Sequence, residues 1–125
     1  MKNRSLFARI GFAVAGWKAA WARERSFRTQ VWFACAALLA LLVLRPSPIW
    51  WAIVAMTCAL VLALELINSA LEGLVDLLHP EIHPEIKIIK DMLAGAVLAI
   101  SCAALVVAAA LAVAYVHAVL LKFET

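Results

Sequence analysis

Three long apolar stretches dominate this chain of 125 residues. They cover about 29–45, 49–78 and 91–121, and a helix needs roughly 20 apolar residues to cross a bilayer. Hydrophobic residues make up 67% of the chain and charged residues 15%, too few polar side chains to cover a water-soluble globule. We therefore expect one all-α integral membrane domain over residues 1–125, with three transmembrane helices.

A fourth helix is predicted before the first apolar stretch, over about residues 6–22. Apolar side chains recur there at steps of three and four residues, the spacing of one helix face, and basic residues flank them. The set is Phe7, Ile10, Val14, Trp17 and Trp21. This pattern favours an amphipathic surface helix that lies among the lipid headgroups. A helix packed on its own protein remains the alternative.

The basic residues indicate a membrane topology rather than a nucleic-acid partner. The net charge is +3, and most basic residues precede the first span or stand at Lys87 and Lys90. The positive-inside rule then places the N-terminus and the connection over 79–90 in the cytoplasm. Arg9 and Lys18 interrupt the first apolar segment, so no cleaved signal peptide is expected. The three cysteines stand singly, without zinc or disulfide spacing.

An acidic stripe in the second apolar stretch is the strongest sign of function. Glu65, Asn68, Glu72 and Asp76 follow at steps of three, four and four residues, which places them along one side of a helix. An unpaired carboxylate at membrane depth costs several kcal/mol or more, so it needs a polar partner, a water-filled site or a cation. A polar contact between helices, with the outer carboxylates merely solvated, is the alternative.

Further charged residues offer partners for a cation and a phosphate. Two carboxylates from separate helices, such as Glu24 and Glu72, can hold Mg²⁺ together with phosphate oxygens and water. Lys90 can neutralise a phosphate in transfer. The chain has no glycine-rich phosphate loop, so carboxylates, metal and basic side chains have to hold any nucleotide. His79 and His83 each precede a proline and are not expected to pair on one metal.

Three motifs in order along the chain resemble the prokaryotic diacylglycerol kinase family of small membrane lipid kinases. The sequence ELINSALEGLVD at 65–76 is similar to the family signature E-x-x-N-[ST]-A-x-E-x-x-x-D. It is supported by AAWARERSFR at 19–28 and IKDM at 89–92. The resemblance implies a homotrimer in the bacterial inner membrane, with three spans and a surface helix per subunit and active sites between subunits.

The resemblance also assigns roles to individual residues. It implies that Glu65 is the catalytic base beside the lipid hydroxyl and that Asn68 supports it. The positions that contact the ATP side of the site are Glu24, Glu72, Glu81, His83, Lys90 and Asp91, and Glu24 and Glu72 among them bind Mg²⁺. The implied reaction is ATP-dependent phosphorylation of diacylglycerol to phosphatidic acid.

Other functions stay open on the sequence. The AGAV and HPEIHPEIK segments also resemble the undecaprenol kinase branch of the family. A small proton-coupled transporter also uses a membrane-embedded glutamate, but has no need of the cytoplasmic cluster of charged residues. A non-catalytic assembly subunit is the third alternative. Its partner surface is a ladder of small residues in the third span, Gly95, Ala99 and Ala103.

Overall fold

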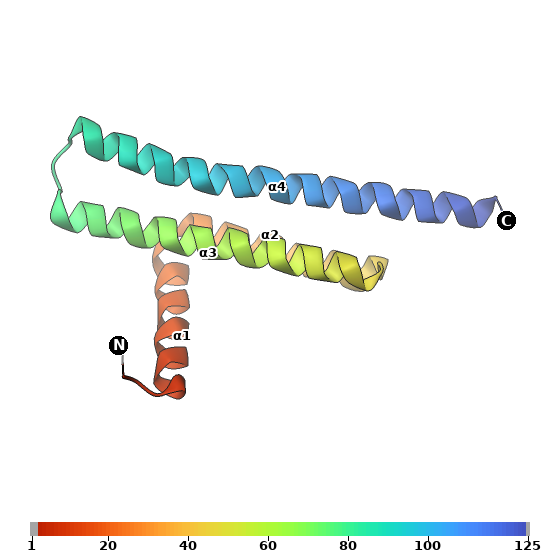
Figure 1. Ribbon diagram of the computed structural model, residues 1–125, viewed down its shortest axis with the longest axis horizontal. Helices are drawn as coiled ribbons and strands as arrows, with labels where there is room; N and C mark the ends of the chain where they lie inside the picture. Colours follow the sequence, from red (N-terminus) through yellow and green to blue (C-terminus); the bar gives the residue numbers. More distant parts are fainter. Residues whose placement is uncertain (1–2, 125) are drawn as a thin grey trace.

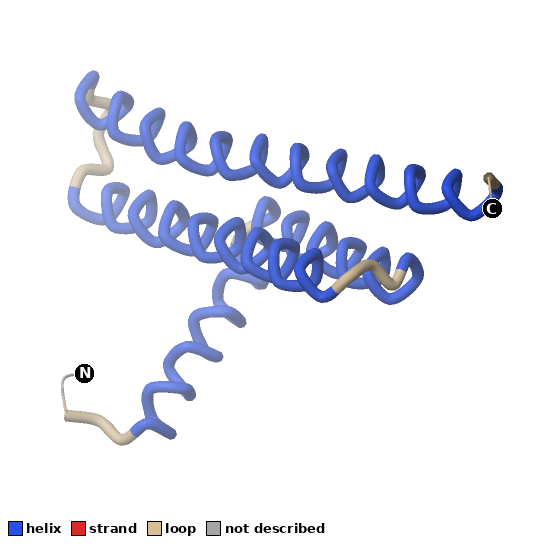
Figure 2. The backbone as a smooth tube through the Cα atoms, turned by 45° about the vertical axis from the view of Figure 1, so that its right-hand side comes forward, coloured by secondary structure: helices blue, strands red, loops and turns tan. Residues whose placement is uncertain are grey.

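The computed structural model describes residues 3–124, and these form four helices and no strand. The helices are α1 (Leu6–Arg23), α2 (Arg25–Leu44), α3 (Pro48–Leu78) and α4 (Pro84–Phe123). The last three run side by side with alternating direction, α3 contacts both α2 and α4, and α1 leaves the bundle at a steep angle (Figures 1 and 2). The prediction of three spans and an N-terminal helix is confirmed.

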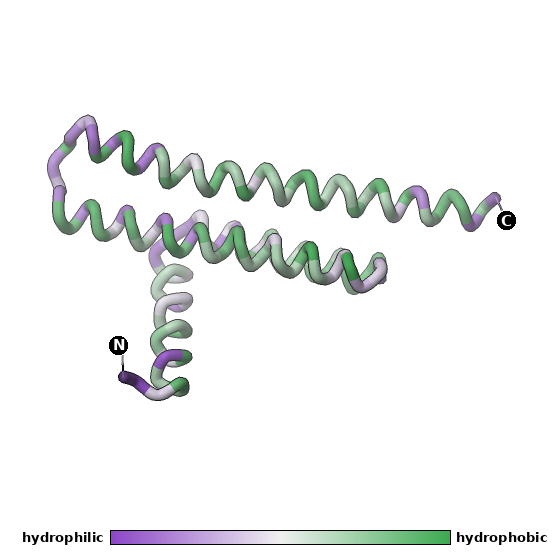
Figure 3. The backbone as a smooth tube through the Cα atoms, in the orientation of Figure 1, coloured by the Kyte–Doolittle hydropathy of each residue, from purple (hydrophilic) through white to green (hydrophobic). Residues whose placement is uncertain are grey.

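The lengths of the helices decide what lies inside a membrane. All three bundle helices are long and apolar enough to cross one, so the chain is a multi-pass membrane protein. α2 has 20 residues, whereas α3 has 31 and α4 has 40. At 1.5 Å per residue α3 and α4 are about 46 and 60 Å long, more than the roughly 30 Å hydrocarbon core. The C-terminal end of α3 and the N-terminal end of α4, which the connection joins, must therefore extend beyond the hydrocarbon core. Figure 3 shows that this end of the bundle is polar.

A sharp corner at Glu24 separates α1 from α2. Glu24 is the one extended residue between them, with φ −111° and ψ 109°. Phe27 is 1% exposed and packs edge-on against Trp17, with ring centroids 5.4 Å apart. The Arg28 guanidinium donates to the Trp21 carbonyl at 2.8 Å, and this bond satisfies a carbonyl in the last turn of α1. These contacts allow α1 to lie along the membrane surface while α2 crosses it.

Prolines and a left-handed residue form the other two connections. Arg45 ends α2 with φ 46° and donates its amide to the Leu41 carbonyl. Pro48 and Pro84 open α3 and α4, where a missing amide costs no helix hydrogen bond. The connection between α3 and α4 therefore covers only residues 79–83 and is shorter than the predicted 79–90. Helix resumes at Pro84, because this proline starts a helix instead of preventing one.

Few side chains are buried within one chain. The apolar core consists of Leu41, Val54 and Leu111, in the half of the bundle away from the polar end. Most large apolar residues on the spans are exposed, as a lipid solvent or neighbouring subunits would permit. The ladder of Gly95, Ala99 and Ala103 is exposed as well and faces no other helix of the same chain.

The turn at Arg45 yields a test of the fold. Among the described residues outside glycine, Arg45 alone has a positive φ, a conformation that costs about 1 kcal/mol for a residue with a Cβ. Arg45→Gly should therefore be more stable than Arg45→Ala by about 1 kcal/mol. Denaturant unfolding of the two purified variants in one detergent measures the difference, and an alanine variant of equal stability would contradict the left-handed turn.

Candidate active site

The acidic stripe lies in the C-terminal half of α3 and contains the most deeply buried polar residue of this helix. Glu65 is 2% exposed, and among residues 3–124 it is the one charged residue that is buried. One turn later, the Asn68 Oδ1 atom is buried without a hydrogen-bond partner. Glu72 follows half-buried. Buried polar atoms are nearly always satisfied in native proteins, so the Asn68 oxygen is available to accept a hydrogen bond from a bound group.

Glu24 is carried to the same level of the bundle as this stripe. α2 runs antiparallel to α3 from the short turn at 45–47. Its N-terminal end therefore lies about twenty residues along α3, beside the stretch 65–72. α1 also contacts α3 directly. Although Glu24 is the N-cap residue of α2, its side chain makes no capping hydrogen bond, so the half-buried carboxylate is left for another partner.

The first turns of α4 carry two predicted residues, Lys90, which contacts α3, and Asp91, which pairs within α4. The Lys90 ammonium donates to the Asp76 carboxylate of α3 at 2.6 Å, and this ion pair joins the two helices. Asp91 accepts from Lys87 at 2.5 Å within α4. The Lys87–Asp91 pair is exposed on both sides and is of the type that contributes little stability.

The predicted residues of the connection lie at the projecting end. Glu81 is exposed between the helices. His83 is the N-cap residue of α4, and its Nδ1 accepts from the Glu85 amide at 3.2 Å. This bond fixes the orientation of the ring and leaves Nε2 as the ring atom that a ligand can use. The cap explains why a histidine stands directly before Pro84.

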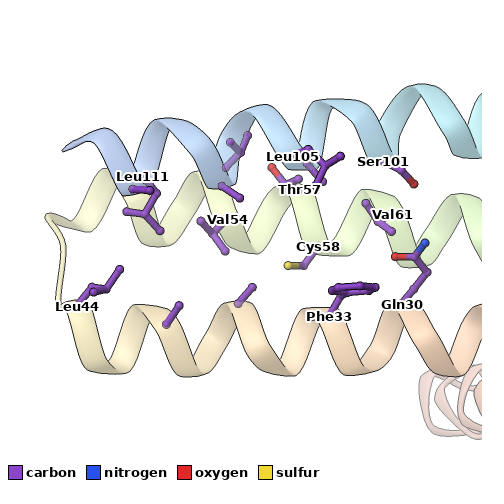
Figure 4. Close-up of a pocket in the computed structure, with 17 residues that line it drawn as sticks. Gln30, Phe33, Leu44, Val54, Thr57, Cys58, Val61, Ser101, Leu105 and Leu111 are labelled. Carbon is purple, nitrogen blue, oxygen red and sulfur yellow. The ribbon is translucent and has the colours of Figure 1, made fainter. Parts of the chain in front are cut away.

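An apolar groove of about 600 Å³ lies between α2 and α4, with α3 as its floor. Figure 4 shows Gln30 and Ser101 toward one end and Leu44 and Leu111 at the other. The groove is wide because alanines form much of both walls: Ala34, Ala37 and Ala40 on α2, and Ala104, Ala108 and Ala112 on α4. Its polar end reaches Val61, one turn before Glu65.

Sequence reasoning missed three polar residues near this end of the groove. Gln30, Thr57 and Ser101 line the groove, although none of them belongs to a recognisable motif. Ser101 and Glu65 each lie eleven residues from the Asp76–Lys90 pair in antiparallel helices, and so occupy one level. The pairing of Asp76 with Lys90 was also missed, because hydrophobic periodicity gives no register between helices.

The donor set agrees with a magnesium ion shared with a substrate. Within residues 3–124, no three His, Cys, Asp or Glu side chains are grouped as a complete metal site. The protein therefore offers Glu24 and Glu72 as separate carboxylates near one level of the bundle. Mg²⁺ commonly takes one or two carboxylates and completes its octahedron with phosphate oxygens and water. The residues present fit that mode.

Comparison with known proteins identifies the family. Residues 11–112 match the sequence profile described as prokaryotic diacylglycerol kinase. The chain belongs to the prokaryotic diacylglycerol kinase family. The resemblance noted on the ELINSALEGLVD segment is thereby confirmed, and that segment holds Glu65, Asn68, Glu72 and Asp76.

Individual relatives of the family differ in name and in coverage. The chain is 39% identical over 104 residues to a diacylglycerol kinase of Synechocystis sp., a match that covers 82% of this chain and 59% of that protein. A diacylglycerol kinase of Helicobacter pylori is 35% identical over 74% of this chain and 73% of its own length. An undecaprenol kinase of Bacillus subtilis is 39% identical over 59% of this chain and 60% of its own.

The unpaired oxygen of Asn68 gives a prediction about stability. Replacing an unsatisfied buried polar group by an apolar group of similar size removes its desolvation cost. Asn68→Leu should therefore leave the ligand-free protein as stable as the wild type or more stable, by up to about 1 kcal/mol. Denaturant unfolding in detergent checks this. A clear loss of stability would show that Asn68 has a structural partner in the assembled protein.

Proposed function

We propose that the chain is a lipid kinase that transfers the γ-phosphate of ATP to the hydroxyl of diacylglycerol and forms phosphatidic acid. The observation that carries this proposal is Glu65, a carboxylate that is 2% exposed and lies one turn beyond Val61, the last residue of α3 that lines the apolar groove. A lipid hydroxyl can reach such a carboxylate while its chains stay in an apolar environment. Family membership and relatives named diacylglycerol kinase support the reaction.

Glu65 acts as the general base in this proposal. The lipid oxygen attacks the γ-phosphorus of ATP, the bond to the β–γ bridging oxygen breaks, and ADP leaves. Glu65 accepts the hydroxyl proton, and Asn68, one turn away with its unpaired Oδ1, helps to orient the bound groups. Phosphoryl transfer depends mostly on positioning and charge stabilisation, so a fixed carboxylate on a long helix suits it.

The nucleotide is bound at the projecting end of α3 and α4. Lys90 neutralises charge on the transferring phosphate, and Asp91, Glu81 and His83 contact the remainder of ATP. This end is polar and lies beyond the apolar part of the spans (Figure 3). ATP therefore approaches from water and the lipid from the membrane, and the two meet near Glu65.

Glu24 and Glu72 are the proposed Mg²⁺ ligands. The ion, when bound, neutralises phosphate charge and bridges phosphate oxygens. The fixed corner at Glu24, held by Phe27 and Arg28, keeps one carboxylate beside α3. Glu72 presents the other from α3 itself.

The active form is proposed to be a homotrimer in the bacterial inner membrane, with the N-terminus in the cytoplasm. The basic segment before α2 and the lysines at the start of α4 support this orientation. The exposed ladder of Gly95, Ala99 and Ala103 supports further subunits around each chain.

Transfer of labelled γ-phosphate tests the function and the substrate together. The purified protein is given Mg·ATP in mixed micelles with diacylglycerol or with undecaprenol. We expect faster labelling of diacylglycerol and no labelling after Mg²⁺ is chelated. Faster labelling of undecaprenol would move the chain to the other branch. A folded protein that labels neither lipid would overturn the proposal and favour a transporter or an assembly subunit.

Replacement of Glu65 tests the catalytic assignment. Glu65→Gln keeps the size and hydrogen-bonding capacity of the side chain but removes the base. Turnover should fall by at least about 100-fold, while assembly, measured by size-exclusion chromatography, stays unchanged. Glu65→Asp, which keeps a displaced carboxylate, should retain more activity than the glutamine variant. An active Glu65→Gln enzyme would show that the base lies elsewhere.

A further inference from the structure

The ion pair between Asp76 and Lys90 links the proposed phosphate-binding lysine to a residue with no role so far. Lys90 Nζ lies 2.6 Å from Asp76 Oδ1. Asp76 is the last member of the acidic stripe on α3, one turn after Glu72. Glu72 also attracts the Lys90 ammonium. The lysine of α4 is therefore held on the acidic side of α3 and near a proposed Mg²⁺ ligand.

Exposure of the pair argues against a mainly structural purpose. The Asp76 side chain is 63% exposed and that of Lys90 is 36% exposed. Ion pairs open to water in this way add little to folding stability. They do restrict the long lysine side chain, which otherwise samples many rotamers at a helix end. The effect of the pair is then to fix where the ammonium lies.

We propose that Asp76 is a positioning residue that holds the Lys90 ammonium in place to meet the transferring phosphate. This inference rests on the proposed function. An ammonium has three N–H donors, so Lys90 can keep its bond to Asp76 and still donate to phosphate oxygens. Asp76 therefore acts through Lys90 throughout the reaction and contacts no substrate itself.

Steady-state kinetics of the full chain with Mg·ATP and diacylglycerol in mixed micelles test this role. Asp76→Asn should lower kcat about tenfold and change KM for ATP less than about twofold, because the charge of Lys90 remains while its placement in the transition state is lost. Asp76→Glu should restore most of the rate. Glu85→Gln, which removes an exposed carboxylate from the first turn of α4, is the matched control and should leave both constants unchanged.

A double-mutant cycle tests whether the effect of Asp76 on the rate depends on Lys90. Asp76→Asn combined with Lys90→Gln should be no slower than Lys90→Gln alone, since the aspartate acts only through the lysine. An additional tenfold loss in the double variant would overturn the inference, as would an Asp76→Asn enzyme with a wild-type kcat or with a change confined to KM.

Chemical modification of lysines in the wild-type protein tests the inference even if the Asp76 variant does not fold. It also separates a failure of the inference from a failure of the proposed function. Acetic anhydride modifies accessible lysines, and mass spectrometry follows each site. In the nucleotide-free wild type, Lys90 should react more slowly than the exposed Lys18 of α1 because its ammonium is held by Asp76. Equal rates would overturn the inference even if Asp76→Asn did not fold. A wild type that labels no lipid but protects Lys90 would overturn the proposed function and leave the held lysine established.

Discussion

The cost of placing a carboxylate among apolar side chains governs this structure. Glu65 is 2% exposed in the C-terminal half of a helix that crosses the membrane, and a charge there requires compensation. The nearest polar group along the helix is Asn68, one turn away, and its Oδ1 is itself buried without a partner. We interpret the fold as a scaffold that holds polar groups at the edge of the lipid.

Short connections with fixed geometry join the long helices. One extended residue turns α1 away from α2, and Phe27, Trp17 and Arg28 fix the angle. At the opposite end of α3, His83 caps α4 and the Asp76–Lys90 pair joins the two helices. Short connections therefore determine the position of Glu24 and Lys90 relative to α3, although neither residue is close to Glu65 in the sequence.

The sequence was sufficient for features that depend on local periodicity and length. Steps of three and four residues placed Glu65, Asn68 and Glu72 on one side of a helix, and the apolar stretches gave the number of spans. It was insufficient where one helix meets another. The partner of Lys90 and the groove depend on register, which no pattern within a single helix encodes. The start of α4 at Pro84 was missed because proline acts both as helix breaker and as first helical residue.

The shortness of α2 couples the site to the membrane around it. α3 and α4 are longer than the hydrocarbon core is thick, whereas the length of the 20-residue helix α2 matches this thickness closely. Only one residue, Glu24, links this helix to α1. A thicker or thinner bilayer must therefore change the tilt of α2 or compress the lipid around it, and either response moves the Glu24 corner along α3. The rate of the proposed kinase reaction should then vary with the thickness of the bilayer that surrounds the protein.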